Sequence, residues 1–197
     1  SNSGRLTLIN STVSGNSADG RGGGGGVSNA NILTVTNSTI SGNTVIPNLG
    51  GGRGGGIYNY NDGTATITGN TVSGNTSPLG GGIHNNITAG VTLTNNTISG
   101  NSSSFAGGGI YNRSTSLTLT NNTIVANSVV QSEGGGVYNE SGQVTARNTL
   151  IALNTSPING PNVYGALTSQ NFNLIGNNAG ATITPAQSSD QIGTAAE

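Results

Sequence analysis

The 197-residue sequence contains no cysteine, methionine or tryptophan, and only 6% of its residues are charged. Without cysteine, neither a disulfide nor a thiolate metal site can contribute to the fold. All five basic residues are arginine, and a formal net charge of −1 leaves no basic face for nucleic acid and no polybasic patch for an anionic membrane. No run of about 18 apolar residues occurs, so we expect no membrane insertion by this segment. Neither an initiator methionine nor a signal peptide is present, and we expect a processed or excised piece of a longer protein.

Against these absences stands a repeat with a period near 27 residues. The segment Leu33–Asn43, which reads LTVTNSTISGN, returns in versions ending at Asn16, Asn75, Asn101 and Asn127, and more weakly at Asn154 and Asn177. A second motif is a glycine run followed by an apolar residue, as in Gly54–Asn59, which reads GGGIYN. A fixed period of this length indicates stacked copies of one small structural unit.

Three apolar positions recur in each copy, and none shows helical spacing. The first is a pair that alternates with threonine, as in Leu33 and Val35, which is the period of a strand. The second follows three residues after an asparagine, as at Ile40, and the third follows the glycine run, as at Ile57. Strands that advance in one direction along an axis must pair in parallel, and parallel crossovers are right-handed. The sequence therefore predicts an all-β, right-handed parallel β-helix of about seven coils, with three short strands per coil.

Asparagines recur at two places in the repeat, where we expect them to form structural ladders. An asparagine side chain tolerates left-handed backbone, and its amide can bond to equivalent amides in the neighbouring coils. One predicted ladder contains Asn16, Asn43, Asn75, Asn101, Asn127 and Asn154, and the other contains Asn29, Asn59, Asn85, Asn112 and Asn139. The longest spacing, between Asn43 and Asn75, predicts an inserted loop at about residues 45–52.

The combination of GGGIYN-type and LTLTNNTISGN-type segments resembles the right-handed β-helix repeats of large exported bacterial surface proteins, which are distantly similar to polymorphic outer-membrane protein repeats. The resemblance covers Leu6 to about Asn177. It implies an extracellular or bacterial cell-surface location and a role in adhesion or as a stalk. Residues 1–177 are accordingly expected to form the repeat domain, and residues 178–197 a capping or linker segment.

Two outward-facing sets of side chains are candidate binding surfaces. A flat Thr-x-Thr array resembles the surfaces of β-solenoid ice-binding proteins, although threonine is also common on strand surfaces; its members are Thr34, Thr36, Thr66, Thr68, Thr92, Thr94, Thr118 and Thr120. An aromatic column could bind sugar rings or simply stiffen the sheet as a side-chain ladder; its members are Tyr58, His84, Tyr111, Tyr138 and Tyr164. The glycine runs are expected to leave a flat, bare face that another solenoid or a loop could approach.

The charged residues do not suggest a catalytic or metal site, and we expect no cofactor. The acids are spread over different coils, whereas polysaccharide lyases and hydrolases need clustered carboxylates; they are Asp19, Asp62, Glu133, Glu140, Asp190 and Glu197. Arg113 and Glu140 follow equivalent asparagines one coil apart, which predicts a surface ion pair. His84, the single histidine, cannot form a metal site or a triad alone.

The sequence therefore favours a non-enzymatic extracellular β-solenoid that acts as a stalk, filament or adhesion segment. The alternatives are an ice-binding protein using the Thr-x-Thr face and a polysaccharide-binding or polysaccharide-degrading β-helix. Possible partners are a second copy, bound end to end or through the glycine face, and a surface receptor or glycan. Nucleic acid is not expected.

Overall fold

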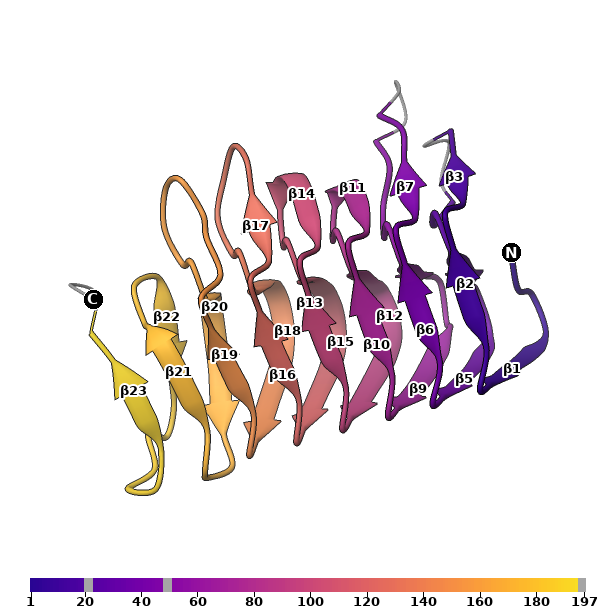
Figure 1. Ribbon diagram of the computed structural model, residues 1–197. Helices are drawn as coiled ribbons and strands as arrows, with labels where there is room; N and C mark the ends of the chain where they lie inside the picture. Colours follow the sequence, from indigo (N-terminus) through magenta and orange to yellow (C-terminus); the bar gives the residue numbers. More distant parts are fainter. Residues whose placement is uncertain (20–22, 48–50, 195–197) are drawn as a thin grey trace.

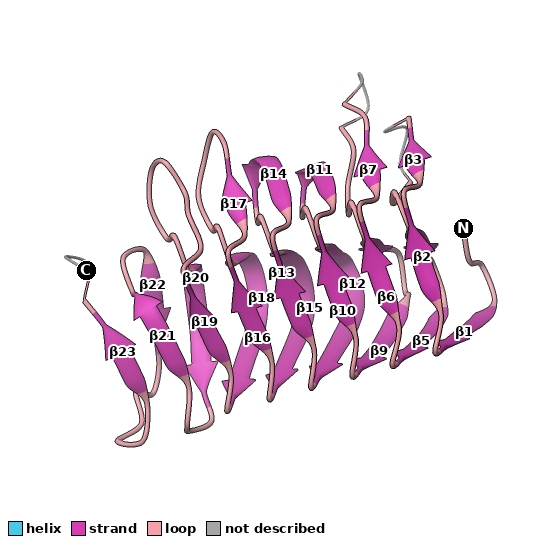
Figure 2. Cartoon of the chain, in the orientation of Figure 1, coloured by secondary structure: helices cyan, strands magenta, loops and turns pink. Residues whose placement is uncertain are grey.

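The chain forms an elongated rod in which the backbone winds repeatedly around one axis, with the two termini at opposite ends (Figure 1). The computed structural model describes residues 1–19, 23–47 and 51–194. Strands and loops alone are drawn in this part of the chain (Figure 2). It contains no helix long and apolar enough to cross a membrane.

Three parallel sheets run along the rod. Within the described residues the first sheet contains β1 (Arg5–Ile9), β4 (Val27–Asn29), β5 (Ile32–Thr36), β8 (Ile57–Asn59), β9 (Thr64–Thr68), β12 (Ile83–Thr94), β15 (Ile110–Thr120), β18 (Val137–Arg147), β20 (Val163–Ser169) and β22 (Ala181–Ile183). The second contains β2 (Thr12–Ser14), β6 (Thr39–Ser41), β10 (Thr71–Ser73), β13 (Thr97–Ser99), β16 (Thr123–Val125), β19 (Leu150–Ala152), β21 (Leu174–Asn177) and β23 (Gln191–Gly193). The third contains β3 (Ser17–Ala18), β7 (Thr44–Val45), β11 (Thr76–Leu79), β14 (Ser102–Ala106) and β17 (Ser128–Val129).

Equivalent residues of successive coils lie over one another, as the repeat predicted. Ile83 pairs with Ile57 on one side and with Ile110 on the other, and all three side chains are fully buried. In the second sheet Val72 lies between Ile40 and Ile98 in the same way. These aliphatic columns form one continuous core. Burying each such side chain contributes roughly 1.5–3 kcal/mol, so the columns are the main source of stability.

The rod has about six turns, one fewer than the sequence suggested. The third sheet ends at β17, beyond which Thr155 adds only an isolated bridge to Ser128. The weak repeat ending at Asn177 therefore lacks the third strand of a complete coil. Beyond it, β22 pairs with β20 and β23 pairs with β21, so the described part of the predicted terminal segment continues two of the sheets. The inserted loop expected at residues 45–52 includes residues 48–50, which lie outside the described residues.

At the corners between strands, left-handed backbone and ladder hydrogen bonds come from different residues, although we expected the same asparagines to provide both. The ladder asparagines are absent from the left-handed positions, and the residue before Asn43 is Gly42, with φ +61°. A separate set of corner asparagines, between the first and second sheets, adopts left-handed backbone: Asn10, Asn37, Asn95, Asn121 and Asn148. The left-handed geometry is thus supplied by one residue and the ladder hydrogen bonds by another.

Candidate functional site

The first predicted ladder is continuous, and it is buried from Asn43 to Asn154. Asn75 donates its side-chain Nδ2–H to Asn101 Oδ1 at 2.9 Å and its backbone N–H to the same oxygen at 3.0 Å. A second Nδ2–H bond goes to the carbonyl of Ile40 at 2.9 Å. The same pattern recurs at Asn43, Asn101 and Asn127. Each amide therefore joins three successive coils.

At its C-terminal end this ladder turns to a residue that the repeat did not predict. Asn154 donates its backbone N–H at 3.2 Å and its Nδ2–H at 3.1 Å to Oδ1 of Asn162, only eight residues further along the chain. At the other end Asn16 is exposed and donates to Asn43 Oδ1 at 2.8 Å.

The second ladder joins the asparagines of the first sheet. Asn29 donates to Asn59 Oδ1 at 2.7 Å, and Asn112 donates to Asn139 Oδ1 at 2.9 Å. Asn2 adds one further rung, with its Nδ2 2.7 Å from Asn29 Oδ1.

A third ladder was missed from the sequence. Asn70 donates to Asn96 Oδ1 and Asn96 donates to Asn122 Oδ1, both at 3.1 Å, in a buried line at the corner between the first two sheets. Serine and threonine occupy the line at Ser38 and Thr149. The sequence signal is a polar residue before each Thr-Ile, Thr-Val or Leu-Ile pair. Because asparagine, serine and threonine all occur in this column, the signal is less regular than those of the other two ladders.

The aromatic column is a stack of rings. Tyr111, Tyr138 and Tyr164 follow one another with centroids 5.1 and 4.9 Å apart and planes within 10° of parallel. His84 stacks on Tyr111, whereas Tyr58 meets His84 edge-on at 5.3 Å. The column was expected to face outward, but Tyr58, His84 and Tyr111 are buried. His84 and Tyr111 are covered by neighbouring rings of the column, and Tyr58 stacks on Tyr60 with centroids 4.8 Å apart, so these three rings offer no face on which a sugar could stack.

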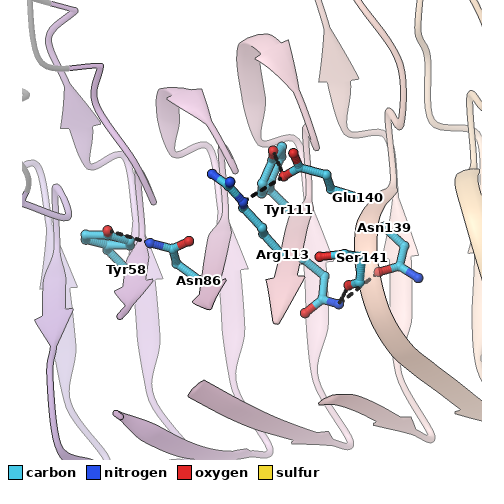
Figure 3. A network of polar contacts seen from close by, with 8 residues as sticks. Tyr58, Asn86, Tyr111, Arg113, Asn139, Glu140 and Ser141 are labelled. Atoms are coloured by element: carbon cyan, nitrogen blue, oxygen red, sulfur yellow. Dashed lines mark hydrogen bonds and ion pairs between the residues drawn. The ribbon is translucent and has the colours of Figure 1, made fainter. Parts of the chain in front are cut away.

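His84 is the most unusual member of this column. Its imidazole is 1% exposed, and neither ring nitrogen has a hydrogen-bond partner. Burial, together with the positive charge of Arg53, lowers the pKa of His84 to about 3. Beside it, Asn86 donates to the hydroxyl of Tyr58 at 3.2 Å (Figure 3). The histidine is therefore neutral at physiological pH.

The predicted ion pair is present. Arg113 Nε lies 3.4 Å from Glu140 Oε2, which also accepts the hydroxyl of Tyr111 (Figure 3). Because the register shifts after Asn112, the backbone of Arg113 pairs with that of Ser141 and not with that of Glu140. The ion pair between Arg113 and Glu140 is therefore diagonal across the two strands. Burial and the bond to Glu140 raise the pKa of Tyr111.

One of the two columns of the threonine array is longer than the sequence indicated. The longer column, which contains Thr34, Thr66, Thr92 and Thr118, continues to Thr7 at one end and through Thr145 to Thr168 at the other. The shorter column, which contains Thr36, Thr68, Thr94 and Thr120, is bounded by Ile9 and Arg147 as expected. Both columns lie on the outer surface of the first sheet.

The glycine runs do not form a bare outer face. A Cβ on Gly108 would lie 2.4 Å from the carbonyl oxygen of Ser128 and 2.5 Å from that of Gly135. Gly55 and Gly81 face backbone oxygens equally closely. Glycine is required here because two passes of the backbone touch inside the rod, which corrects the expectation of a flat surface.

The described carboxylates have separate surroundings. Glu133 accepts the hydroxyl of Ser132, Glu140 binds Arg113, and Asp190 accepts backbone N–H groups of Asn173 and Gln187. Asp19 and Asp62 also have interaction partners, and Glu197 lies outside the described residues. Among the described residues, no group of three or more histidine, cysteine or acidic side chains could hold a metal ion.

Comparison with known families agrees with this geometry. The model of a family described as "right handed beta helix region" matches residues 1–184. The chain belongs to the right-handed β-helix family. This assignment agrees with the hand predicted from parallel crossovers. Comparison with curated proteins gave no match, and comparison with solved structures gave none.

Proposed function

We propose that this β-helix is a non-enzymatic structural segment of an exported bacterial surface protein, where it serves as a stalk, a filament or an adhesion element. The observation that carries the proposal is the buried asparagine ladder, in which every amide from Asn43 to Asn127 is bonded to the next coil and Asn154 is bonded to Asn162. Such a ladder resists both bending and slippage of one coil over another, because any shift leaves buried amide groups unpaired. A rigid spacer requires this property.

The partners of three carboxylates support the non-enzymatic part of the proposal. Polysaccharide hydrolysis needs two carboxyl groups about 5–9.5 Å apart across one bond. Glu140 instead binds Arg113, Glu133 binds Ser132, and Asp190 binds the backbone N–H of Asn173. Incubation with pectic and other polysaccharides, followed by reducing-end assays, tests this part; turnover would contradict it.

Labelling of intact cells tests the surface location. Antibodies against the rod should stain intact cells that produce the parent protein, and staining only after permeabilisation would overturn the proposal. Electron microscopy of the purified chain tests the filament form separately. Dispersed short rods at high protein concentration would remove end-to-end assembly and leave the stalk.

The threonine columns favour a second candidate function, binding to ice. Seven threonines from Thr7 to Thr168 lie in one unbroken register, so their hydroxyl groups repeat at the spacing of parallel strands, about 4.8 Å. Thermal hysteresis of the purified protein tests this candidate, with Thr92→Tyr at the centre of the array as the disrupting variant. An absence of hysteresis at high protein concentration would exclude it.

A further inference from the structure

One corner of the rod contains an additional residue. Thr145 pairs with Thr168, 23 residues later, whereas Leu150 pairs with Leu174, 24 residues later. The carbonyl of Asn171 accepts the N–H of Asn148, just as the carbonyl of Arg147 accepts the N–H of Asn121 one coil earlier. Phe172 therefore occupies the corner position that Asn121 and Asn148 fill in the preceding coils, and the additional residue lies just before it.

Phe172 has a conformation that its chemistry does not favour. Its φ is +61°, in the left-handed region that other corners fill with asparagine or glycine, and its side chain is 60% exposed. Bulky residues rarely adopt this conformation, and an exposed ring gains little from burial. Strain of this kind is concentrated at functional sites.

Side chains of Ser189 and Asp190 hold this corner in place. The backbone N–H of Phe172 donates to Ser189 Oγ at 3.3 Å, and that hydroxyl donates to Asn171 Oδ1 at 3.0 Å. The N–H of Asn173 donates to Asp190 Oδ1 at 2.9 Å. The aromatic ring is thus presented from a fixed backbone, as a preformed site requires.

Phe172 borders a surface hollow of about 310 Å³, at the small end of the range of about 300–1,000 Å³ for small-molecule sites. Leu150 and Leu174 contribute apolar surface, while Asn121, Asn148 and Thr123 contribute polar groups. Asn148 donates Nδ2–H to Asn121 Oδ1 at 2.9 Å. This bond leaves the amide NH2 of Asn121 and the amide oxygen of Asn148 to serve as donor and acceptor. No charged residue lines the hollow.

We propose that this hollow binds one ring of a neutral oligosaccharide, with a C–H face of the sugar against Phe172 and its hydroxyls bonded to Asn121 and Asn148. An entirely apolar ligand would leave the two amides desolvated without partners, which is unfavourable. An anionic sugar would find no arginine in the lining. The proposal is independent of the stalk function, which stands whether or not the hollow binds sugar.

Titration of the ¹⁵N-labelled chain with cellohexaose, laminarihexaose and mannohexaose, followed by NMR, tests the proposal. We expect at least one of them to shift the amide signals of Asn121, Asn148 and Leu174, with a Kd on the order of 1 mM, typical of weak single-site binding. Trigalacturonate should produce no shifts at these residues. Absence of shifts with all three neutral sugars at about 10 mM, well above that Kd, would overturn the proposal.

Two matched variants separate the ring from the corner that presents it. Phe172→Ser should weaken binding by about tenfold or more, as loss of a central aromatic anchor does, and Phe172→Trp should retain it. Leu153→Ser is the control, because Leu153 is also exposed and left-handed, with φ +58°, but does not line this hollow. Equal binding by Phe172→Ser would overturn the proposal. Shifts at Phe172 that depend on protein concentration without sugar would also overturn it, in favour of a second copy as occupant.

Discussion

His84 and Tyr111 stack face to face, with ring centroids 4.6 Å apart and planes at 15°, and the imidazole is nearly inaccessible to water. A protonated imidazole in this position would carry a charge among buried rings, near the guanidinium of Arg53. The position therefore depends on the histidine remaining neutral.

Acid should consequently destabilise the rod through His84. Between the ordinary histidine pKa and the folded value of about 3, the unfolded chain binds a proton that the folded chain does not. Stability is thus fully present above about pH 6.5 and falls by up to about 1.4 kcal/mol per pH unit as the pH drops toward 3. His84→Phe should remove this slope. Urea denaturation of both proteins at several pH values measures it, and parallel slopes would contradict the prediction.

Removal of a central ladder amide should be strongly destabilising. Asn101→Ala would remove the acceptor for the backbone and side-chain N–H groups of Asn75 and would leave buried groups of three coils unpaired. At about 1–3 kcal/mol for each unsatisfied buried group, we expect a loss of at least about 3 kcal/mol in the free energy of unfolding. Asn16→Ala, at the exposed end of the same ladder, should lose about 1 kcal/mol or less. Similar losses in both variants would argue against the ladder as a source of rigidity.

The internal glycines should tolerate no side chain. Gly108→Ala would place a methyl group 2.4 Å from the carbonyl oxygen of Ser128, so the two passes of backbone must separate. Overpacking of this kind costs about 1–3 kcal/mol, and we expect the upper end because backbone rather than a flexible side chain must move. Gly4→Ala is the control, since nothing lies within 4 Å of the position that its methyl group would occupy. Thermal unfolding of the two variants should show a lowered Tm for Gly108→Ala alone.

Asp190 should make the C-terminal corner sensitive to strong acid. Burial alone would raise the pKa of this carboxyl, but hydrogen bonds from Ser169, Asn173 and Gln187 lower it below its ordinary value. Its stabilising contribution is therefore present above the unfolded pKa of about 3.9 and is lost as the pH falls through the lower folded value. The protection factors of the Asn173 and Gln187 amides against hydrogen exchange should fall over that interval. Asp190→Asn should show a weaker pH dependence, and an unchanged one would refute the assignment.

The repeat predicted the winding, the parallel register and the inward aliphatic columns, because stacking places like residues over like residues. Asn101 and Asn112 were assigned to their ladders for the same reason. The burial of Tyr58 and His84 could not be predicted, since strand alternation places these residues outside the core and gives no information on what covers that face. Phe172 was missed because a single phenylalanine at a corner that other coils fill with asparagine or glycine leaves no repeating pattern.

Within the described part of the chain, strand β1 has a hydrogen-bonded neighbour on one side only, and Leu6 and Leu8 are only partly buried, whereas β12 and β15 are covered on both sides. In a stacked array each unit is stabilised by its neighbours, so loss of structure propagates from an outer coil inward. Amide exchange should therefore be graded along the axis, fastest near Leu6 and slowest near Leu117. The slowly exchanging central coils would stay folded after partial unfolding, and the outer coils could then refold onto them.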